Sequence, residues 1–215
     1  MKKLQITEIF HSLQGEATQA GRPTVFVRLT GCPLRCTYCD TEYAFHGGTS
    51  MSVEEVVERV TSYDCNLVEV TGGEPLSQPL AFELLRVLAE KGFELMLETS
   101  GALSIEQVHA KVKVIMDIKT PSSGESHRNL WDNIQHLQKE KDEIKFVVSD
   151  QKDLEYCDEI VRKHQLQEKA TLLLSPNFGK IDHQKVASWI LQSKIPYRMQ
   201  LQMHKYIWDP QARGV

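Results

Sequence analysis

The chain has 215 residues and a mass of 24.6 kDa, enough for one large domain with a substantial hydrophobic core. Its formal net charge of −4 argues against non-specific nucleic-acid binding, which usually shows as a basic surface. Polar residues interrupt any apolar run that could form a signal peptide or a membrane span. We therefore expect a cytoplasmic protein, bound to neither membrane nor nucleic acid, with a single domain over residues 1–215.

Short runs rich in Val, Ile, Leu and Phe alternate with amphipathic helical patterns along the chain. The predicted strands cover residues 24–31, 67–73, 93–101, 112–119, 143–149 and 170–176. The predicted helices begin at Ser52, Leu80 and Leu154, and another helical run at 183–194 precedes a last strand-like stretch at 197–208. Ser52 and Glu55 fit a capping box, and Gly92 is placed to end the second helix.

This alternation favours an α/β fold with a mostly parallel sheet, because parallel strands need crossover connections. About six such units can curl into an incomplete, TIM-like βα barrel, in which functional residues gather at the carboxyl ends of the strands. Four motifs lie at such ends: a cysteine cluster, TGGEP, ETSG and DIKTPSSG follow the first four predicted strands. The sequence therefore predicts one functional mouth of the barrel.

Three of the five cysteines are gathered in one short segment. Cys32, Cys36 and Cys39 form a C-x3-C-x2-C pattern with no fourth cysteine beside them. Soft thiolates in a reducing compartment favour zinc or iron–sulfur chemistry over disulfides. A zinc site would need a fourth ligand, for which His46 is available. A [4Fe–4S] cluster held by three cysteines instead keeps one iron open to a ligand that is not protein.

The cysteine pattern resembles the cluster motif of the radical S-adenosylmethionine superfamily, and Tyr38, just before the last cysteine, fits it as well. Residues 71–75, TGGEP, resemble the glycine-rich segment that binds the methionine amine of the cofactor in that superfamily. Paired glycines let the backbone approach a ligand closely, and the carboxylate of Glu74 suits a nearby ammonium. The resemblance implies that S-adenosylmethionine docks on the open iron and is cleaved by one electron to a 5′-deoxyadenosyl radical.

Residues 8–32, CDT, ETSG and the stretch at 200–210 resemble the 7-carboxy-7-deazaguanine synthase family. The resemblance covers about residues 5–210. It implies a carbon–nitrogen lyase that converts 6-carboxy-5,6,7,8-tetrahydropterin to 7-carboxy-7-deazaguanine and releases ammonia, in queuosine and 7-deazapurine biosynthesis. It also implies assistance by Mg²⁺ and an electron donor such as flavodoxin or ferredoxin. The open edge of the barrel indicates a homodimer.

The resemblance also assigns roles to individual residues. The three cysteines bind the cluster, and Thr41 matches a magnesium ligand, which predicts weak magnesium binding until substrate arrives. The expected cofactor contacts are Tyr38, Gly72, Gly73, Glu74, Asp117, Ile118 and Lys119, the last three departing from the SPK form of some relatives. The expected substrate contacts are Leu13, Gln14, Gly15, Glu16, Arg28, Thr71, Ser175, Pro176, Asn177, Phe178, His204 and Pro210.

Some of these assignments have a physical reason. Arg28 can offer a two-pronged guanidinium to the carboxylate of the pterin. Gln14 and Glu16, on either side of Gly15, offer the amide and the carboxylate that can read an aminopyrimidinone edge. A strand-end aspartate such as Asp117 can bind the ribose hydroxyls of the cofactor.

The last stretch carries an alternating pattern. Gln200, Gln202 and His204 are predicted to share one face of a strand, which makes His204 a candidate pterin contact. Pro210 matches a substrate-contacting proline at the end of the family's chains, but here five residues follow it.

Two other functions remain open at this stage. An activase that generates a glycyl radical on a partner protein shares the cluster motif and TGGEP, but needs a protein-docking surface instead of a pterin pocket. A non-catalytic zinc-binding module needs only the thiols and a fourth ligand.

Overall fold

The structure is a computed structural model that describes residues 3–215, and its strands form one nine-stranded sheet in the order β3-β1-β2-β4-β5-β6-β7-β8-β9. The strands are β1 (Leu4–Leu13), β2 (Pro23–Leu29), β3 (Thr49–Met51), β4 (Leu67–Gly72), β5 (Glu94–Thr99), β6 (Lys113–Asp117), β7 (Glu143–Val148), β8 (Thr171–Pro176) and β9 (Tyr197–Met199). The α-helices are α1 (Val53–Thr61), α2 (Leu80–Glu90), α3 (Gln151–His164), α4 (His183–Gln192) and α5 (His204–Ile207). Short 3-10 helices cover Glu42–Ala44, Pro75–Ser77, Pro121–Ser123, Ser126–Arg128, Trp131–His136 and Leu166–Glu168.

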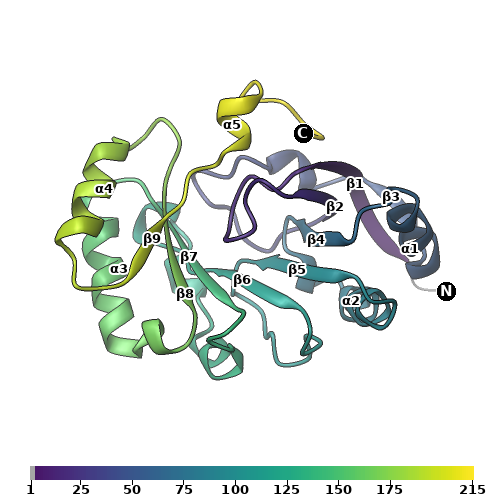
Figure 1. Ribbon diagram of the computed structural model, residues 1–215, viewed down its shortest axis with the longest axis horizontal. Coiled ribbons are helices and arrows are strands. Elements are labelled where there is room, and N and C mark those ends of the chain that lie inside the picture. Colours follow the sequence, from purple (N-terminus) through teal and green to yellow (C-terminus); the bar gives the residue numbers. More distant parts are fainter. Residues whose placement is uncertain (1–2) are drawn as a thin grey trace.

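Seven of these strands, β2 and β4 to β9, run parallel, and β1 and β3 complete one edge in antiparallel pairing. The sheet curves into an open barrel with α1 and α2 outside one half, α3 and α4 outside the other, and α5 above the opening (Figure 1). The predicted α/β fold with an incomplete barrel is confirmed. The sequence analysis missed β1 because polar residues such as Gln5, Glu8 and Ser12 break up its apolar pattern.

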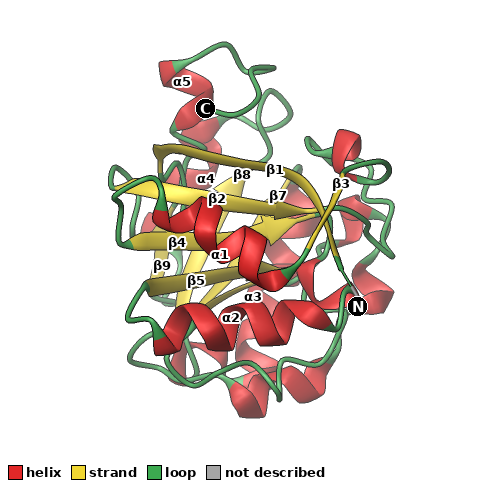
Figure 2. Ribbon diagram, turned by 90° about the vertical axis from the view of Figure 1, so that its right-hand side faces the viewer, coloured by secondary structure: helices red, strands yellow, loops and turns green. Residues whose placement is uncertain are grey.

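The helices begin and end close to where the sequence places them. The Ser52 side chain accepts from the Glu55 N–H over 3.2 Å and the Glu55 carboxylate accepts from the Ser52 N–H over 2.6 Å, so the capping box is present. Helix α3 begins three residues before the predicted Leu154, since Asp150 caps it by accepting from the Asp153 N–H over 3.0 Å. The view turned by 90° shows α1 and α2 lying across the outside of the strands (Figure 2). Within residues 3–215, no helix has the length and apolar character needed to cross a bilayer.

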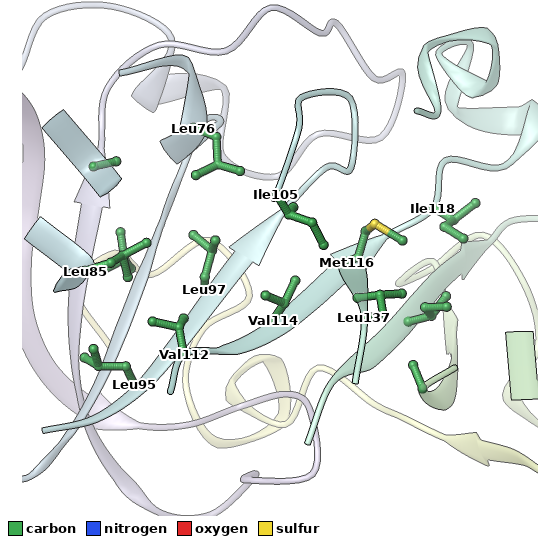
Figure 3. Packing of buried hydrophobic residues seen from close by; sticks show 14 of the residues in the cluster. Leu76, Leu85, Leu95, Leu97, Ile105, Val112, Val114, Met116, Ile118 and Leu137 are labelled. Carbon is green, nitrogen blue, oxygen red and sulfur yellow. The ribbon is translucent and has the colours of Figure 1, made fainter. Parts of the chain in front are cut away.

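The two faces of the sheet differ because successive side chains of a strand point to opposite sides. On the outer face, Leu95 and Leu97 of β5 and Val114 and Met116 of β6 pack beside Leu85 of α2 (Figure 3). The alternate residues point into the barrel, where a smaller apolar cluster fills the interior: Ala17, Leu67, Met96, Ile115 and Leu173. The same inward alternation carries the polar side chains of the site.

The prediction of a long last strand at 197–208 is wrong. Strand β9 ends at Met199, and the Gln200 N–H makes a last bond to the Leu174 carbonyl over 3.0 Å. The chain then turns over the barrel opening, where the Met203 N–H donates to the Gly15 carbonyl over 2.9 Å, and α5 begins at His204. The polar side chains of this stretch therefore do not share a strand face.

Candidate functional site

A cavity of about 740 Å³ lies at the carboxyl ends of the strands, between the sheet and the C-terminal segment. Nineteen of the predicted site residues line it: Leu13, Gln14, Gly15, Glu16, Arg28, Cys32, Cys36, Tyr38, Cys39, Thr41, Thr71, Gly72, Gly73, Asp117, Lys119, Asn177, Phe178, His204 and Pro210. Glu74, Ile118, Ser175 and Pro176 are buried behind its wall. Segments far apart in sequence thus meet at one mouth of the barrel.

The three thiols of the cysteine segment are free, half-buried and open on this cavity. Burial raises the pKa of the Cys36 thiol to about 11 and also raises the pKa values of Cys32 and Cys39, so all three are protonated until a metal replaces the proton. Across residues 3–215, no three His, Cys, Asp or Glu side chains are arranged to hold a single metal ion. Three soft thiols on one cavity, with one ligand position left to a non-protein group, fit a [4Fe–4S] cluster.

Paired glycines connect β4 to the cysteine segment. A Cβ on Gly73 would lie 2.2 Å from the Gly31 carbonyl oxygen and 3.0 Å from the Cys32 Cβ. Gly72 has φ +147°, and a Cβ there would lie 2.2 Å from the Leu29 carbonyl oxygen. Gly72 thus allows a close approach to β2 and Gly73 a close approach to the cysteine segment, in addition to the approach to a ligand that the sequence suggests.

Glu74, whose carboxylate the sequence analysis expects to meet an ammonium, lies outside the cavity lining and is bound within the protein. The side chain is completely buried and accepts from the Ser100 N–H over 2.7 Å, the Ser100 hydroxyl over 2.6 Å and the Leu76 N–H over 3.0 Å. The Thr99 hydroxyl donates to the same carboxylate. Because these donors occupy both oxygens, Glu74 ties β4 to the end of β5.

The end of β6 presents a charged pair to the cavity. Lys119 Nζ donates to Asp117 Oδ2 over 2.8 Å, and although burial opposes the charge, Asp117 holds the pKa of Lys119 above its ordinary value. Asp117 Oδ1 and the Tyr38 hydroxyl are buried without a hydrogen-bond partner among the described residues. Unpartnered buried polar atoms indicate a polar ligand at this wall. Between them in sequence, Ile118 points its side chain into the outer core (Figure 3), which leaves only its backbone for a cofactor contact.

The loop after β1 is bound both by the sheet and by the residues that follow β9. Lys145 of β7 donates to Glu16 Oε2 over 2.9 Å, and Gln200 and Gln202 donate to the two Glu16 oxygens over 2.7 and 3.0 Å. Burial opposes the charge of Glu16, but Lys145 keeps its pKa below the ordinary value. A Cβ on Gly15 would lie 2.4 Å from His204 Nδ1, so the glycine is what allows His204 to pack here.

Arg28 stands among acidic and aromatic groups. Its Nε donates to Glu8 Oε1 over 2.7 Å, and the Tyr43 hydroxyl donates to the same oxygen over 2.8 Å. Both terminal nitrogens of Arg28 remain available to a ligand, since this ion pair uses Nε only. Arg213 approaches the Tyr43 ring with its Cζ 4.1 Å from the ring centroid, so the residues after Pro210 also line this end of the cavity.

Asp40 and Thr41 lie at the rim. The Thr41 hydroxyl donates to Asp40 Oδ1 over 3.0 Å, which leaves the hydroxyl lone pairs free. Asp40 Oδ2 accepts from Lys205 over 2.7 Å and from Gln202 over 3.0 Å. These contacts attach the C-terminal segment to the cysteine segment.

The segment after β8 is divided between the wall and the core. Ser175 and Pro176 are buried outside the cavity lining, whereas Asn177 and Phe178 line it. Asn177 donates to the Ser149 hydroxyl over 2.9 Å. Of the four predicted contacts, the structure therefore brings two to the site.

Comparison with known proteins identifies the family. Residues 26–121 match the radical SAM superfamily. The 7-carboxy-7-deazaguanine synthase of Chlorobaculum tepidum is 44% identical over 214 residues, which are 99% of this chain and 97% of that protein. The chain belongs to the 7-carboxy-7-deazaguanine synthase family. The synthase of Koribacter versatilis is also similar, with 41% identity over 227 residues, 99% of this chain and 100% of that protein.

The fold is similar to that of the crystal structure of QueE from Escherichia coli, with a TM-score of 0.78 and 24% identity over 95% of this chain and 96% of that chain. Membership of this radical SAM family makes the chain a carbon–nitrogen lyase that uses a [4Fe–4S] cluster and S-adenosylmethionine. The alternatives of a glycyl-radical activase and of a zinc-binding module are wrong.

Three cavity-side ionisable residues of this synthase-family chain were missed by the sequence analysis: Glu69, Glu98 and Lys145. Each stands at an inward position of a parallel strand, next to apolar residues that point to the outer core. The signal that could have found them is the charge itself, because strands covered on both faces rarely carry unpaired charges.

Proposed function

We propose that this chain converts 6-carboxy-5,6,7,8-tetrahydropterin to 7-carboxy-7-deazaguanine with release of ammonia, as part of queuosine and 7-deazapurine biosynthesis. The observation that carries the proposal is the meeting of the three thiols, the paired glycines and Arg28 on one cavity. Such a cavity can hold the cluster, the cofactor and a pterin next to one another. A cluster held by Cys32, Cys36 and Cys39 would, together with S-adenosylmethionine, supply radical hydrogen-atom abstraction from the substrate.

The protein's contribution to this reaction is binding, orientation and exclusion of water. Cys32, Cys36 and Cys39 hold the cluster, and the backbone of Gly72 and Gly73 lies where it can bind the cofactor's methionine group. The unpartnered oxygen of Asp117 and the Tyr38 hydroxyl suit the polar groups of the cofactor. Lys119 fixes the orientation of Asp117 through their ion pair.

The substrate lies, in this proposal, between the β2 end and the C-terminal segment. Arg28 offers its two terminal nitrogens to the pterin carboxylate. Gln14, Glu16 and Thr71 provide polar groups for the ring edge. His204, whose pKa burial lowers, is neutral and can accept or donate one hydrogen bond.

Magnesium binds, in this proposal, to the free lone pairs of the Thr41 hydroxyl, to water and to the substrate. One neutral hydroxyl cannot hold the ion alone, so magnesium and substrate bind together. Calorimetric titration with Mg²⁺ checks this: Thr41→Val should abolish the magnesium-dependent gain in pterin affinity, while Thr41→Ser should retain it.

We further propose that residues 1–215 act as one domain, that the chain is a homodimer and that flavodoxin or ferredoxin delivers the electron. The continuous nine-stranded sheet supports the first proposal. The edge strand β9 and exposed Leu191 on the adjoining helix α4 support a second copy there. Exposed Arg35 in the cysteine segment gives an acidic donor a cation to contact. Analytical sedimentation checks the homodimer, and reduction of the cluster by flavodoxin or ferredoxin checks the electron donor.

Anaerobic reconstitution followed by mass spectrometry of the products tests the function. We expect about four irons per chain and formation of 7-carboxy-7-deazaguanine. Cys36→Ala should lose both, whereas Cys65→Ala, at a thiol that lies outside the cavity lining, should keep both. A reconstituted, S-adenosylmethionine-cleaving protein that leaves the tetrahydropterin unchanged would contradict the proposed substrate.

A further inference from the structure

Beneath the proposed substrate contacts lies a group of buried ionisable side chains. Lys145 donates to Glu16 over 2.9 Å and also to Glu98, so two carboxylates share its charge. Glu69 of β4 is buried and lines the same cavity, yet none of the ion pairs formed within residues 3–215 includes it. Two carboxylates thus share the Lys145 ammonium, and Glu69, which lies within its electrostatic influence, is left without a cation of its own.

The two oxygens of Glu69 have different surroundings. Gln14 Nε2 donates to Oε2 over 2.6 Å. Oε1 has no hydrogen-bond partner among the described residues and is not one of the fully enclosed atoms, so it opens on the cavity. Because Oε2 already serves as the acceptor for Gln14, a proton on this carboxyl is best placed on Oε1.

The charged groups around Glu69 favour that proton. They are Glu16 in the loop after β1, Arg28 on β2, Glu98 on β5 and Lys145 on β7. Arg28 is already paired with Glu8 over 2.7 Å, and Lys145 is paired twice. Burial, followed by repulsion from Glu98, therefore dominates and raises the pKa of Glu69 to about 8.

We propose that Glu69 is a neutral hydrogen-bond donor of this cavity, which keeps its proton on Oε1 and gives it as a hydrogen bond to a carbonyl or ring-nitrogen acceptor of the bound heterocycle. The proposal rests on the proposed function, since it deepens the account of how the cavity recognises a pterin. The neighbouring Glu16 presents only acceptors, because its carboxylate is ionised by Lys145. A protonated Glu69 adds the complementary donor, so Glu16 and Glu69 together can bind both a donor and an acceptor on one edge of the heterocycle.

The test is a binding measurement on the cluster-reconstituted protein with 6-carboxypterin, followed by the fluorescence of the pterin from about pH 6 to about pH 9. Glu69→Gln keeps a donor at this position and cannot lose a proton. We expect its affinity near pH 6 to stay within about threefold of the parent, while Glu69→Ala loses about tenfold or more. As the pH rises past about 8, the parent should lose affinity about tenfold more than Glu69→Gln.

The matched control is Glu143→Gln. Glu143 begins β7, is as buried as Glu69 and lies outside the cavity lining, but it is paired with Lys113 of β6. This control should follow the parent at every pH. Titration of the ligand itself is common to all the proteins, so only their differences count. The assignment is overturned if Glu69→Gln has the parent's pH dependence, or if near pH 6 it binds as weakly as Glu69→Ala.

A second measurement does not depend on the ligand. The infrared difference spectrum between parent and Glu69→Gln at neutral pH should contain the C=O stretching band of a protonated carboxyl, and its absence overturns the proposal. If the parent forms product but the band is absent, only the role of Glu69 fails. If the band is present but the parent neither binds the pterin nor turns over the tetrahydropterin, the proposed function fails and the pterin acceptor fails with it.

Discussion

The Ser100 backbone N–H donates to Glu74 Oε2 over 2.7 Å, so the carboxylate of the TGGEP segment is bound to the neighbouring strand end. The Ser100 and Thr99 hydroxyls donate to the same group. Glu74 therefore fixes the relative position of two strand ends that line the site.

Glu74→Ala should consequently destabilise the protein, because the Ser100 and Thr99 donors are left buried without an acceptor. We expect a loss of about 3 kcal/mol in the free energy of unfolding, measured by denaturant titration of the cluster-free protein. Glu90→Ala, at an exposed helix end, should cost within about 0.5 kcal/mol and is the control. A Glu74→Ala protein of parental stability that cannot bind S-adenosylmethionine would instead show that the carboxylate contacts the cofactor.

Gly73→Ala should damage the cluster site specifically. The added methyl would lie 2.2 Å from the Gly31 carbonyl oxygen and must displace the backbone next to Cys32. We expect a marked fall in iron content and in the cluster's visible absorbance after reconstitution. Gly92→Ala is the contrast: its φ of +90° makes alanine unfavourable by about 1 kcal/mol, but nothing lies within 4 Å of the new methyl. Equal iron content in both variants would refute this role of Gly73.

Much of the fold could be predicted from sequence because the parallel strands are rich in Val, Ile, Leu and Phe and alternate with amphipathic helices. Strand β1 was not predicted because polar residues such as Gln5 and Glu8 interrupt its apolar pattern. Antiparallel pairing with β2 stabilises it, and only the folded structure shows this pairing. The last stretch was misassigned for a similar reason. Its alternating polar residues follow from contacts made across the barrel opening, such as Gln202 with Glu16, and not from one face of a strand.

The site residues also differ in how far the sequence could predict them. Local motifs, such as the cysteine pattern, predicted residues whose spacing in sequence fixes their chemistry. The contact between Glu69 and Gln14 joins residues 55 positions apart, and the one between Lys145 and Glu16 joins residues 129 positions apart. Neither pairing has a local signal, so the buried charges could be noticed in the sequence but their partners could not.

The folding stability should fall as the pH rises toward 8, through Glu69. The unfolded carboxyl has a pKa of about 4.3 and the folded one of about 8, so between these values the folded state binds more protons than the unfolded state. The free energy of unfolding therefore decreases with pH in this window, by up to roughly 5 kcal/mol from this group. Below about pH 4 the group is protonated in both states and contributes no change.

Denaturant titrations of the cluster-free protein at about pH 5 and about pH 8 check this sign. Glu69→Gln should be more stable than the parent at the higher pH and should show a smaller loss between the two. A residual slope is expected from Glu98, whose pKa burial also raises. An identical slope in parent and variant would mean that Glu69 titrates alike in the folded and unfolded states.

Arg213 should strengthen substrate binding at the end of the cavity where Arg28 lies. The charge of Arg28 is balanced by Glu8, whereas none of the ion pairs of the described residues includes Arg213, which lies over the Tyr43 ring and lines the cavity. An unpaired guanidinium at the mouth attracts a pterin carboxylate more strongly than a paired one. Arg213→Ala should therefore raise KM for the tetrahydropterin about tenfold with little change in kcat, since a charge-assisted contact contributes about 1.5 kcal/mol or more. Arg59→Ala removes a similar contact, between Arg59 of the outer helix α1 and the Tyr63 ring, and should leave KM unchanged. An unchanged KM in Arg213→Ala as well would mean that Arg213 stays outside the bound complex.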